Sequence, residues 1–170
     1  DDYLTLAKAR GKAMQAPDDP DFDAGSMLAV MGELEKIKTE LSDFPKVKIA
    51  NLNSKGQVVL AGATEEVLNV QKHLKQKKFR TVLLGVSAAF HTELVGHAQK
   101  PFAKAIGAAK FRKANCKVYS NATGKPYAAD PKAIQKTLQE HILNSVLFKD
   151  EIENIYDDGV GDNINTLHPD

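Results

Sequence analysis

The sequence predicts an α/β chain, of the α+β kind in its first half, with a small sheet unit at residues 23–84 set between helical segments. Three observations predict it. Short apolar runs bounded by turn residues alternate with amphipathic stretches inside that unit. The flanks, 1–22 and 85–158, have mainly helical periodicity, whereas 159–170 is polar, aperiodic and expected to be an irregular tail. A chain of 170 residues, 42% of them hydrophobic, can bury a real core.

Each element of the sheet unit has its own signal. The apolar run after Gly25-Ser26 is typical of a buried strand, and a helix with one apolar face follows it. Two more strands flank a turn whose residues tolerate left-handed angles, and the second helix has Thr64 as its predicted N-cap. The predicted strands are 27–31, 47–50, 57–61 and 80–84, the turn is 53–56, and the helices are 33–41 and the segment from 64. This βαββαβ order is that of the ferredoxin-like fold.

The flanking segments are predicted to be mainly helical. A lone short strand needs neighbours, so we expect these segments to form the border of a larger α/β domain. A helix is already under way at the start, without an initiator Met, so we expect the chain to be cut from something larger. The predicted elements are helices at 3–15, 92–110 (interrupted by Pro101), 131–143 and 149–156, a strand at 117–120 and a turn-rich loop at 121–126.

Composition excludes several classes of function. The formal net charge is +1, which favours neither a nucleic-acid partner nor a membrane surface. No apolar run approaches the roughly 18 residues of a membrane span. The single cysteine, Cys116, cannot form an internal disulfide and fits a reducing, cytoplasmic compartment. No phosphate-binding glycine loop is present, and no metal is predicted, because four histidines lack ligand spacing: His73, His97, His141 and His168.

Five residues are considered for chemistry from their own context. His91 follows a run of small residues after a predicted strand, where an imidazole can be held rigidly and still reach a cleft; a solvated histidine at a helix start is the alternative. Arg10 can grip a carboxylate with two parallel hydrogen bonds, or be an ordinary surface charge. Asn53 and Gln57 could line a pocket, although turn chemistry alone explains Asn53. We expect Cys116 to be incidental, a small buried apolar residue.

Taken together, the chain resembles the malonyl-CoA:acyl-carrier-protein transacylase family, which includes the acyltransferase domains of polyketide and fatty acid synthases. The amino-acid sequence of its loops is most similar to that of the acyltransferase of bacterial polyunsaturated fatty acid synthases. The resemblance runs from about residue 1 to 158. The hairpin motif and the histidine motif, taken together, are specific for this family. The stretches that carry it, in family order, are Ala9-Arg10-Gly11-Lys12-Ala13-Met14, the hairpin from Ile49 to Gly62, Val86-Ser87-Ala88-Ala89-Phe90-His91-Thr92, Tyr119-Ser120-Asn121-Ala122-Thr123-Gly124, and Asn144-Ser145-Val146-Leu147-Phe148.

The resemblance implies a large α/β-hydrolase-like body, a small ferredoxin-like subdomain and a Ser-His ping-pong acyl transfer. It implies that His91 is the base and that Arg10 holds the free carboxylate of malonyl. Phe90 leaves little room for an α-methyl branch, which favours malonyl over methylmalonyl. The backbone carbonyl of Leu147 is expected to orient His91.

Weaker matches and the expected partners complete the implied site. Asn53 and Gln57 match residues near the acyl pocket. No cofactor is expected to be bound; the substrates are malonyl-CoA, a CoA thioester, and the phosphopantetheine of an acyl carrier protein. Other domains of a multi-domain synthase are expected as partners, and neither nucleic acid nor membrane.

Two departures from the family pattern matter. The Gly-His-Ser-x-Gly nucleophile elbow and the glutamine loop should precede residue 1, and the end of the chain does not match the family's Gly-Pro loop. We therefore expect this polypeptide alone to be inactive, since a base without a nucleophile has nothing to activate. One alternative is a non-catalytic interaction module that docks a carrier protein or neighbouring synthase domains. Another alternative is a free-standing small-molecule-binding ferredoxin-like protein. Residues 85–158 argue against it, because they would have no function there.

Overall fold

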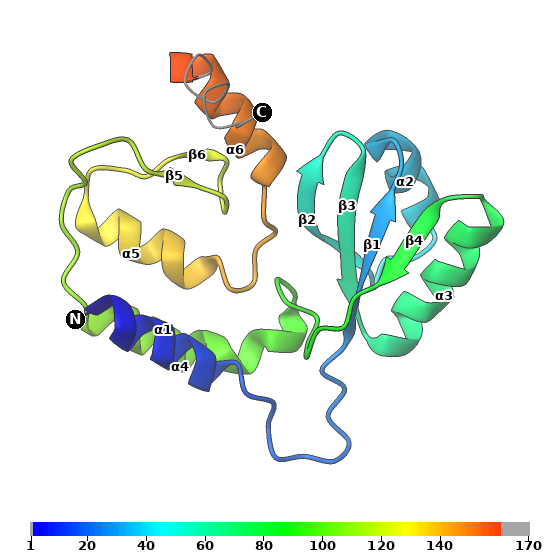
Figure 1. The fold of residues 1–170 in the computed structure, drawn as a ribbon. Coiled ribbons are helices and arrows are strands. Elements are labelled where there is room, and N and C mark those ends of the chain that lie inside the picture. Colours follow the sequence, from blue (N-terminus) through cyan, green and yellow to red (C-terminus); the bar gives the residue numbers. More distant parts are fainter. Residues whose placement is uncertain (1, 161–170) are drawn as a thin grey trace, which may run out of the picture.

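The computed structural model describes residues 2–160, and the predicted order of elements in the sheet unit is confirmed. Most of the predicted irregular tail, residues 161–170, lies outside the described residues. Figure 1 shows a sheet unit on one side and a group of helices on the other, joined by two extended connections. The elements of the sheet unit are β1 (Ser26–Met31), α2 (Leu34–Leu41), β2 (Lys48–Ser54), β3 (Gln57–Gly62), α3 (Thr64–Gln76) and β4 (Arg80–Leu83).

The four strands form one antiparallel sheet in the order β2-β3-β1-β4. β2 and β3 make a hairpin around Lys55-Gly56, and β2 continues to Ser54, four residues beyond the predicted strand. Register shifts next to Asn51 and Ser54 interrupt its pairing with β3. Such bulges bend a strand and re-aim its side chains. Because the strand order is β2-β3-β1-β4, the edge strands of the sheet are β2 and β4.

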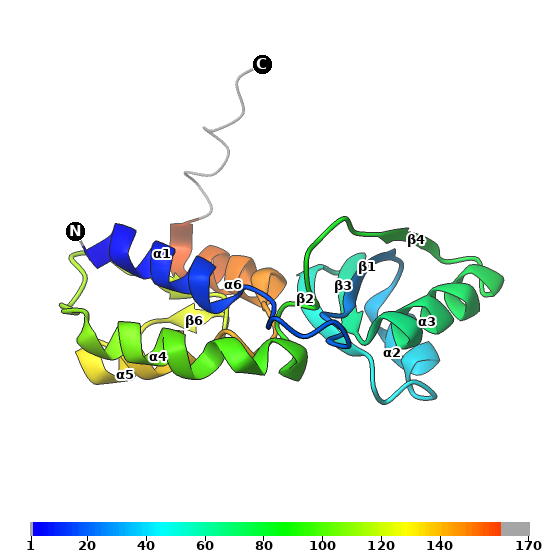
Figure 2. The same cartoon turned by 90° about the horizontal axis from the view of Figure 1, so that it is seen from below.

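Both faces of the sheet are apolar, because the inner strands place hydrophobic residues on both sides. The helices α2 and α3 cover the first face (Figures 1 and 2). The second face is turned toward the histidine loop and packs against it. The first core contains Leu28, Val30, Ile37, Val47, Val58, Leu60, Val67, Val70 and Leu74; the second contains Met27, Ala29, Ala50, Val59, Ala61 and Ala89.

Asp23, not Thr64, caps α3, so the predicted capping residue is wrong. The carboxylate of Asp23 accepts from the backbone N–H of Thr64 (2.8 Å) and from its hydroxyl (2.7 Å). These two hydrogen bonds also lower the pKa of Asp23. The chain can bend back here because Gly25 has φ +77°, where an added Cβ would stand 2.5 Å from the carbonyl oxygen of Gly62. The cap of α3 is thus supplied by a residue 41 positions before Thr64, and not by a residue of the helix itself as predicted.

The flanking segments form a group of helices with one small hairpin. α4 lies between α1 and α5 (Figure 2) and is fastened to α5 by the amides of Gln135 and Gln139, which donate to carbonyls of α4 and its end. The helix expected over 92–110 divides before Gln99, so Pro101 falls in the first turn of α4, where its missing N–H costs nothing. The elements are α1 (Asp2–Ala13), η1 (Glu93–Ala98), α4 (Gln99–Ala108), β5 (Tyr119–Ser120), β6 (Lys125–Pro126), α5 (Pro131–Glu140), α6 (Phe148–Ile155) and η2 (Tyr156–Val160).

Candidate active site

His91 lies in the loop between β4 and η1, and the backbone on both sides of it is fixed. Its φ is +63°, a region that costs a non-glycine residue about 1 kcal/mol or more and persists where the surroundings impose it. The buried Thr92 donates its hydroxyl to the carbonyl of Ala89 (2.7 Å) and accepts from the N–H of Leu94 (3.2 Å), which caps η1. Ala89 in turn donates its N–H to the carbonyl of Ala24 (2.8 Å). The imidazole is therefore held by a turn that is itself hydrogen-bonded to the sheet unit.

The hydrogen bonds of the His91 ring define its tautomer. Nδ1 lies 2.9 Å from the carbonyl oxygen of Asn144 and 3.2 Å from that of His141. A carbonyl oxygen only accepts, so Nδ1 carries the proton and Nε2 presents its lone pair. Within residues 2–160, no group hydrogen-bonds Nε2. This is the form of histidine that can take a proton from a hydroxyl or a thiol.

The carbonyl of Asn144 is held in place because the next residues pair with the edge of β2. Val146 donates its N–H to the carbonyl of Ala50 (2.8 Å) and accepts from the N–H of Leu52 (2.8 Å), which forms a parallel bridge. The hydroxyl of Ser145 donates to the carbonyl of Ile49 (2.6 Å). Residues 144–147 are called the clamp below. The bulged edge of β2 thus positions the clamp, and the clamp positions the imidazole.

Leu147 does not orient His91, contrary to the expectation. Its carbonyl accepts from the N–H of Glu151 (2.9 Å) and so starts α6, while its N–H donates to the carbonyl of Asn121 (2.6 Å). The acceptor of the histidine is three residues earlier, at Asn144. The difference arises because the chain turns into a helix at Leu147, so that its carbonyl points along the helix.

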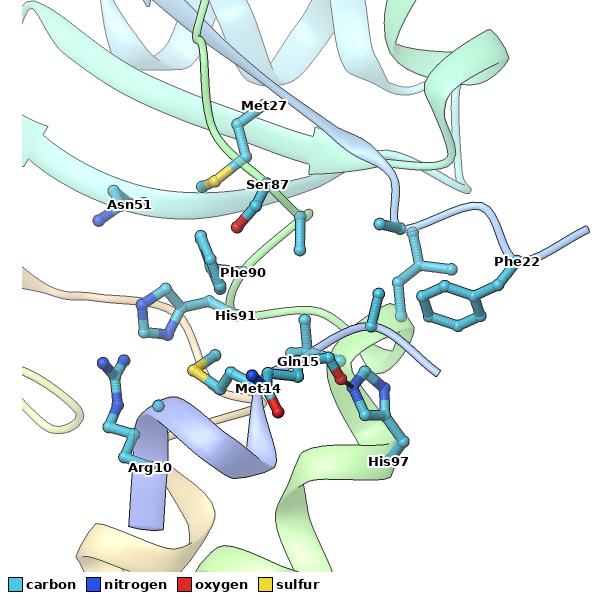
Figure 3. Close-up of a pocket in the computed structure, with 16 residues that line it drawn as sticks. Arg10, Met14, Gln15, Phe22, Met27, Asn51, Ser87, Phe90, His91 and His97 are labelled. Atoms are coloured by element: carbon cyan, nitrogen blue, oxygen red, sulfur yellow. Dashed lines mark hydrogen bonds between the residues drawn. The ribbon is translucent and has the colours of Figure 1, made fainter. Parts of the chain in front are cut away.

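A cavity of about 660 Å³ opens beside the imidazole. Figure 3 shows the side chains of His91, Phe90 and Arg10 around one space, with Arg10 reaching up from α1 and the other two coming from the loop after β4. The cavity therefore brings together segments from both parts of the molecule. Its lining is Arg10, Gly11, Met14, Gln15, Ala16, Phe22, Ala24, Met27, Asn51, Ser87, Ala88, Phe90, His91, Leu94, Val95 and His97.

Arg10 offers a free guanidinium to this cavity. It lies in the last turn of α1, and no carboxylate within residues 2–160 comes within 4 Å of it. Its positive charge lowers the pKa of His91 and of His141, which shows that it acts on both rings electrostatically. An unpaired arginine beside an apolar cavity is suited to bind an anionic group with two parallel hydrogen bonds.

Burial is the main reason that the pKa of His91 lies below the ordinary value. The hydrogen bonds to the carbonyls of His141 and Asn144 oppose this shift, and the charge of Arg10 adds to it. The net effect keeps the imidazole neutral at neutral pH. A neutral imidazole is ready to accept a proton, so the electrostatics agree with the tautomer.

His141 is a second, neutral histidine behind the first, and sequence reasoning did not identify it. Its ring lies 5.2 Å from that of His91, centre to centre, with an angle of 39° between the planes. Burial first, then the charges of His91 and Arg10, lower the pKa of His141 to about 4. Its Nε2 is buried and has no hydrogen-bond partner within residues 2–160. When His91 accepts a proton, its neighbour therefore stays uncharged.

The remaining predicted residues divide between the cavity and the hairpin. Phe90 is half-buried, lines the cavity and packs against the second core of the sheet. Asn53 and Gln57 do not line it; the amide of Asn53 donates to that of Gln57 (3.4 Å) across the hairpin. Among the hairpin amides, the one that lines the cavity is that of Asn51, two residues before Asn53. Because β2 is bulged here, strand alternation could not assign which of the two asparagines enters the site.

The cysteine considered as a candidate lies away from this cavity. Cys116 is exposed, where a buried residue was expected, and it borders a separate cavity of about 510 Å³ whose lining contains no histidine. Within residues 2–160 no cluster of three metal-ligating side chains is present. No helix in that range has the length and apolar character needed to cross a membrane.

Comparisons with known proteins identify the family of this chain. The family model described as an acyl transferase domain matches residues 5–165. The polyketide biosynthesis protein ThaF of Burkholderia thailandensis is 35% identical over 164 residues, which are 94% of this chain and 14% of that protein. One subunit of the polyunsaturated fatty acid synthase of a Thraustochytrium species is 32% identical over 162 residues, 94% of this chain and 6% of that protein.

A solved structure of a related protein is also similar to this chain in its fold. The acyl-carrier-protein-S-malonyltransferase of Bartonella henselae superposes with a TM-score of 0.83 at 29% identity, covering 93% of this chain and 51% of that one. The chain thus spans about half of that structure and only a small fraction of the two relatives above. The match covers the helices, the sheet unit and the histidine loop together. The chain therefore belongs to the acyl transferase domain family.

Proposed function

We propose that this chain carries the base and the carboxylate-binding arginine of a malonyl transferase site, which moves malonyl from CoA to an acyl carrier protein. One observation carries the proposal: in a single cavity His91 presents a free Nε2, and Arg10 presents a guanidinium without a carboxylate partner. A base and an anion site side by side are what transfer of a carboxylated acyl group needs. The similarity to a malonyltransferase structure supports the same reaction.

In this mechanism Nε2 of His91 takes the proton of a serine hydroxyl as its oxygen attacks the thioester carbonyl of malonyl-CoA. The imidazolium then gives that proton to the departing CoA sulfur, and the malonyl group remains as a serine ester. In the second half, Nε2 takes the proton of the carrier's phosphopantetheine thiol, whose sulfur attacks the ester. The proton passes to the serine oxygen, and malonyl leaves on the carrier. Nδ1, fixed on the carbonyl of Asn144, keeps Nε2 directed at the reacting groups.

Arg10 and Phe90 select the acyl group in this proposal. The guanidinium binds the free carboxylate of malonyl, and the ring of Phe90 fills the space beside its α-carbon. A steric feature of this kind discriminates by only about 1–3 kcal/mol per methyl group, which favours malonyl over methylmalonyl. Asn51, rather than Asn53 or Gln57, is the amide positioned to contact the acyl group.

The proposal also assigns the two parts of the fold. Residues 23–84 are the small ferredoxin-like subdomain, consistent with the βαββαβ order and the strand order β2-β3-β1-β4. Residues 1–22 and 85–158 belong to the larger hydrolase-like body. Ser87 lines the cavity, but no hydrogen bond joins its hydroxyl to His91. We therefore propose that the 170 residues alone transfer no acyl group and that the nucleophile belongs to the remainder of the domain.

Intact-protein mass spectrometry with malonyl-CoA tests the proposal. We expect a malonyl adduct on a version extended upstream through a Gly-His-Ser-x-Gly elbow, and its loss to added carrier protein. The 170-residue chain should stay unlabelled. If the extended version gains no adduct, the transferase assignment is wrong and the docking alternative replaces it. Labelling of the short chain would instead identify a nucleophile within it and overturn the assignment of inactivity.

Arg10 is tested by substitution in the extended version. Arg10→Ala removes hydrogen bonds to a charged group, each contributing about 1.5–3 kcal/mol. With two such bonds lost, we expect malonyl transfer to fall by at least about 100-fold, and acetyl transfer, which has no carboxylate to bind, to change little. Lys8→Ala, an exposed cation on the same helix, is the matched control. An equal loss for both acyl groups would show that Arg10 does not bind the carboxylate.

A further inference from the structure

The two edges of the sheet end differently, and the β4 edge is free. β4 is the last strand of the sheet, and the N–H of Leu84 donates to the carbonyl of Met27 on β1 (2.9 Å). In an antiparallel pair the backbone groups of alternate residues point to the same side. Val82 therefore faces β1 as Leu84 does, and the N–H and C=O groups of Thr81 and Leu83 point outward. Two residues of β4 thus offer a backbone ladder to another strand.

Apolar side chains surround this free edge. Val82 (44% exposed) and Leu83 (43%) are consecutive on β4, so their side chains lie on opposite faces of the sheet beside this edge; Val86 (41%) lies in the loop that follows, and Leu68 of α3 is 43% exposed. Single exposed hydrophobic residues are ordinary, but a group of them on one side of a molecule marks an interaction surface. An open strand edge with exposed apolar residues is also a liability unless something covers it.

The same side of the molecule is basic. Leu68, Lys72 and Lys75 follow one another at helical spacing on α3, on the flank opposite His73, which bonds Glu40 of α2 (2.7 Å). Figure 2 shows α3 between β4 and α2, so this basic flank faces the β4 side. Lys78 lies in the turn before β4. Within residues 2–160 no carboxylate lies within 4 Å of the four cations of this surface, Lys72, Lys75, Lys78 and Arg80.

We propose that the β4 edge binds an extended, acidic and apolar segment of a partner polypeptide, which adds to the sheet as a fifth strand. Thr81 and Leu83 would provide the backbone hydrogen bonds, and the exposed residues around Val82 would receive alternate apolar side chains. The unpaired cations select carboxylates on the partner. A second copy of this chain is disfavoured as the occupant, because it would bring the same set of unpaired cations to the interface from both sides. The inference does not depend on acyl transfer.

The test measures binding of a labelled eight-residue peptide of alternating Glu and Val to the 170-residue chain by fluorescence polarisation. A Lys-Val peptide of the same length is the charge control. We expect the acidic peptide to bind at least tenfold more tightly at low salt, with amide NMR shifts concentrated in residues 80–86. Equal binding of the two peptides, or shifts located elsewhere, would overturn the proposal. So would a concentration-dependent dimer that forms through β4 and excludes the peptide.

Two sets of variants separate charge from backbone pairing. Lys78→Glu with Arg80→Glu should weaken the acidic peptide at least tenfold and favour the Lys-Val peptide. Lys100→Glu with Lys132→Glu makes the same charge change on exposed residues of α4 and α5 and should shift binding less than threefold. A similar loss from both double variants would overturn the proposed site.

Leu83→Pro tests the fifth strand itself, because it removes an outward N–H and no bond to β1. Leu83→Ala loses the side chain alone and serves as its control. We expect the proline variant to bind at least tenfold more weakly than the alanine variant, with circular dichroism showing that both remain folded. Equal affinities would contradict strand addition, and Thr81→Pro repeats the comparison without changing Leu83.

Discussion

The two edges of the sheet in this protein have opposite surroundings. The edge of β2 is closed by the clamp, whose Val146 makes two backbone hydrogen bonds and whose Ser145 makes a third from its side chain. The edge of β4 is open and lined by apolar and basic side chains. The closed edge fixes the clamp, and the carbonyl of Asn144 in the clamp fixes the imidazole of His91. The small sheet thus supports the site at one edge and remains free to pair with another strand at the other.

The largest expected effect comes from opening the closed edge. Val146→Pro removes the N–H that donates to the carbonyl of Ala50 and leaves that carbonyl unpaired, which costs about 1–3 kcal/mol. The clamp then no longer fixes Asn144, so malonyl transfer by the extended protein should fall by at least 100-fold. Urea unfolding and the adduct assay measure the two effects.

The open edge provides the matched control for stability. Leu83→Pro removes an N–H that points to solvent, so its cost in unfolding free energy should be smaller than that of Val146→Pro once the lost leucine contacts are subtracted with Leu83→Ala. Equal costs at the two edges would mean that the clamp does not contribute more than an ordinary surface segment.

Acid should lower the free energy of unfolding through the two histidines beside the clamp, His91 and His141. The pKa values of His91 and His141 are lowered, the latter to about 4, so the unfolded chain binds more protons than the folded one below pH 6.5. Their contribution to stability is complete above about pH 6.5 and is lost as the pH falls toward 4. The slope is at most about 1.4 kcal/mol per pH unit for each histidine, and solvent screening reduces it.

Unfolding free energies measured between pH 8 and pH 4 test this slope. His141→Gln should flatten the curve, because it removes the buried histidine whose pKa is lowered to about 4. A curve for His141→Gln that parallels the wild-type curve would show that burial of His141 does not govern the acid response.

Sequence patterns predicted the sheet unit because each of its elements is amphipathic by itself. The four strands, two helices and their order follow from local apolar spacing, and the resemblance pointed to Arg10, Phe90 and His91, which line one cavity. What local patterns could not predict depends on contacts between distant segments. The cap of α3 comes from Asp23, and the carbonyl that orients His91 comes from Asn144 rather than Leu147.

Two of the missed features have identifiable physical causes. Asn51 enters the cavity in place of Asn53 because bulges shift the register of β2, and strand alternation cannot reveal a bulge. His141 carried no signal, since a histidine near a helix end is ordinarily solvated. Only the fold places its ring 5.2 Å from that of His91.

The smallest expected effect lies at the open edge. The hydroxyl of Thr81 is buried without a hydrogen-bond partner within residues 2–160, whereas the hydroxyl of Ser145 in the clamp is paired. Thr81→Val replaces it with a methyl group of similar volume and should raise stability by about 1 kcal/mol. Differential scanning calorimetry should show a rise of a few degrees in Tm, and Thr81→Ser, which keeps the hydroxyl, should show none. A fall in Tm for the valine variant would mean that the hydroxyl has a partner after all.

The tautomer of His91 tests the central claim most directly, because base catalysis and the closed edge both depend on it. Nitrogen-15 NMR of the imidazole rings in the 170-residue chain at pH 7.5, assigned with His91→Gln, measures which nitrogen carries the proton. We predict a protonated Nδ1 and an unprotonated Nε2, with the Nδ1 proton lost to exchange faster in Val146→Pro. A proton on Nε2, with Nδ1 bare, would contradict both the orientation by Asn144 and the role of His91 as the base.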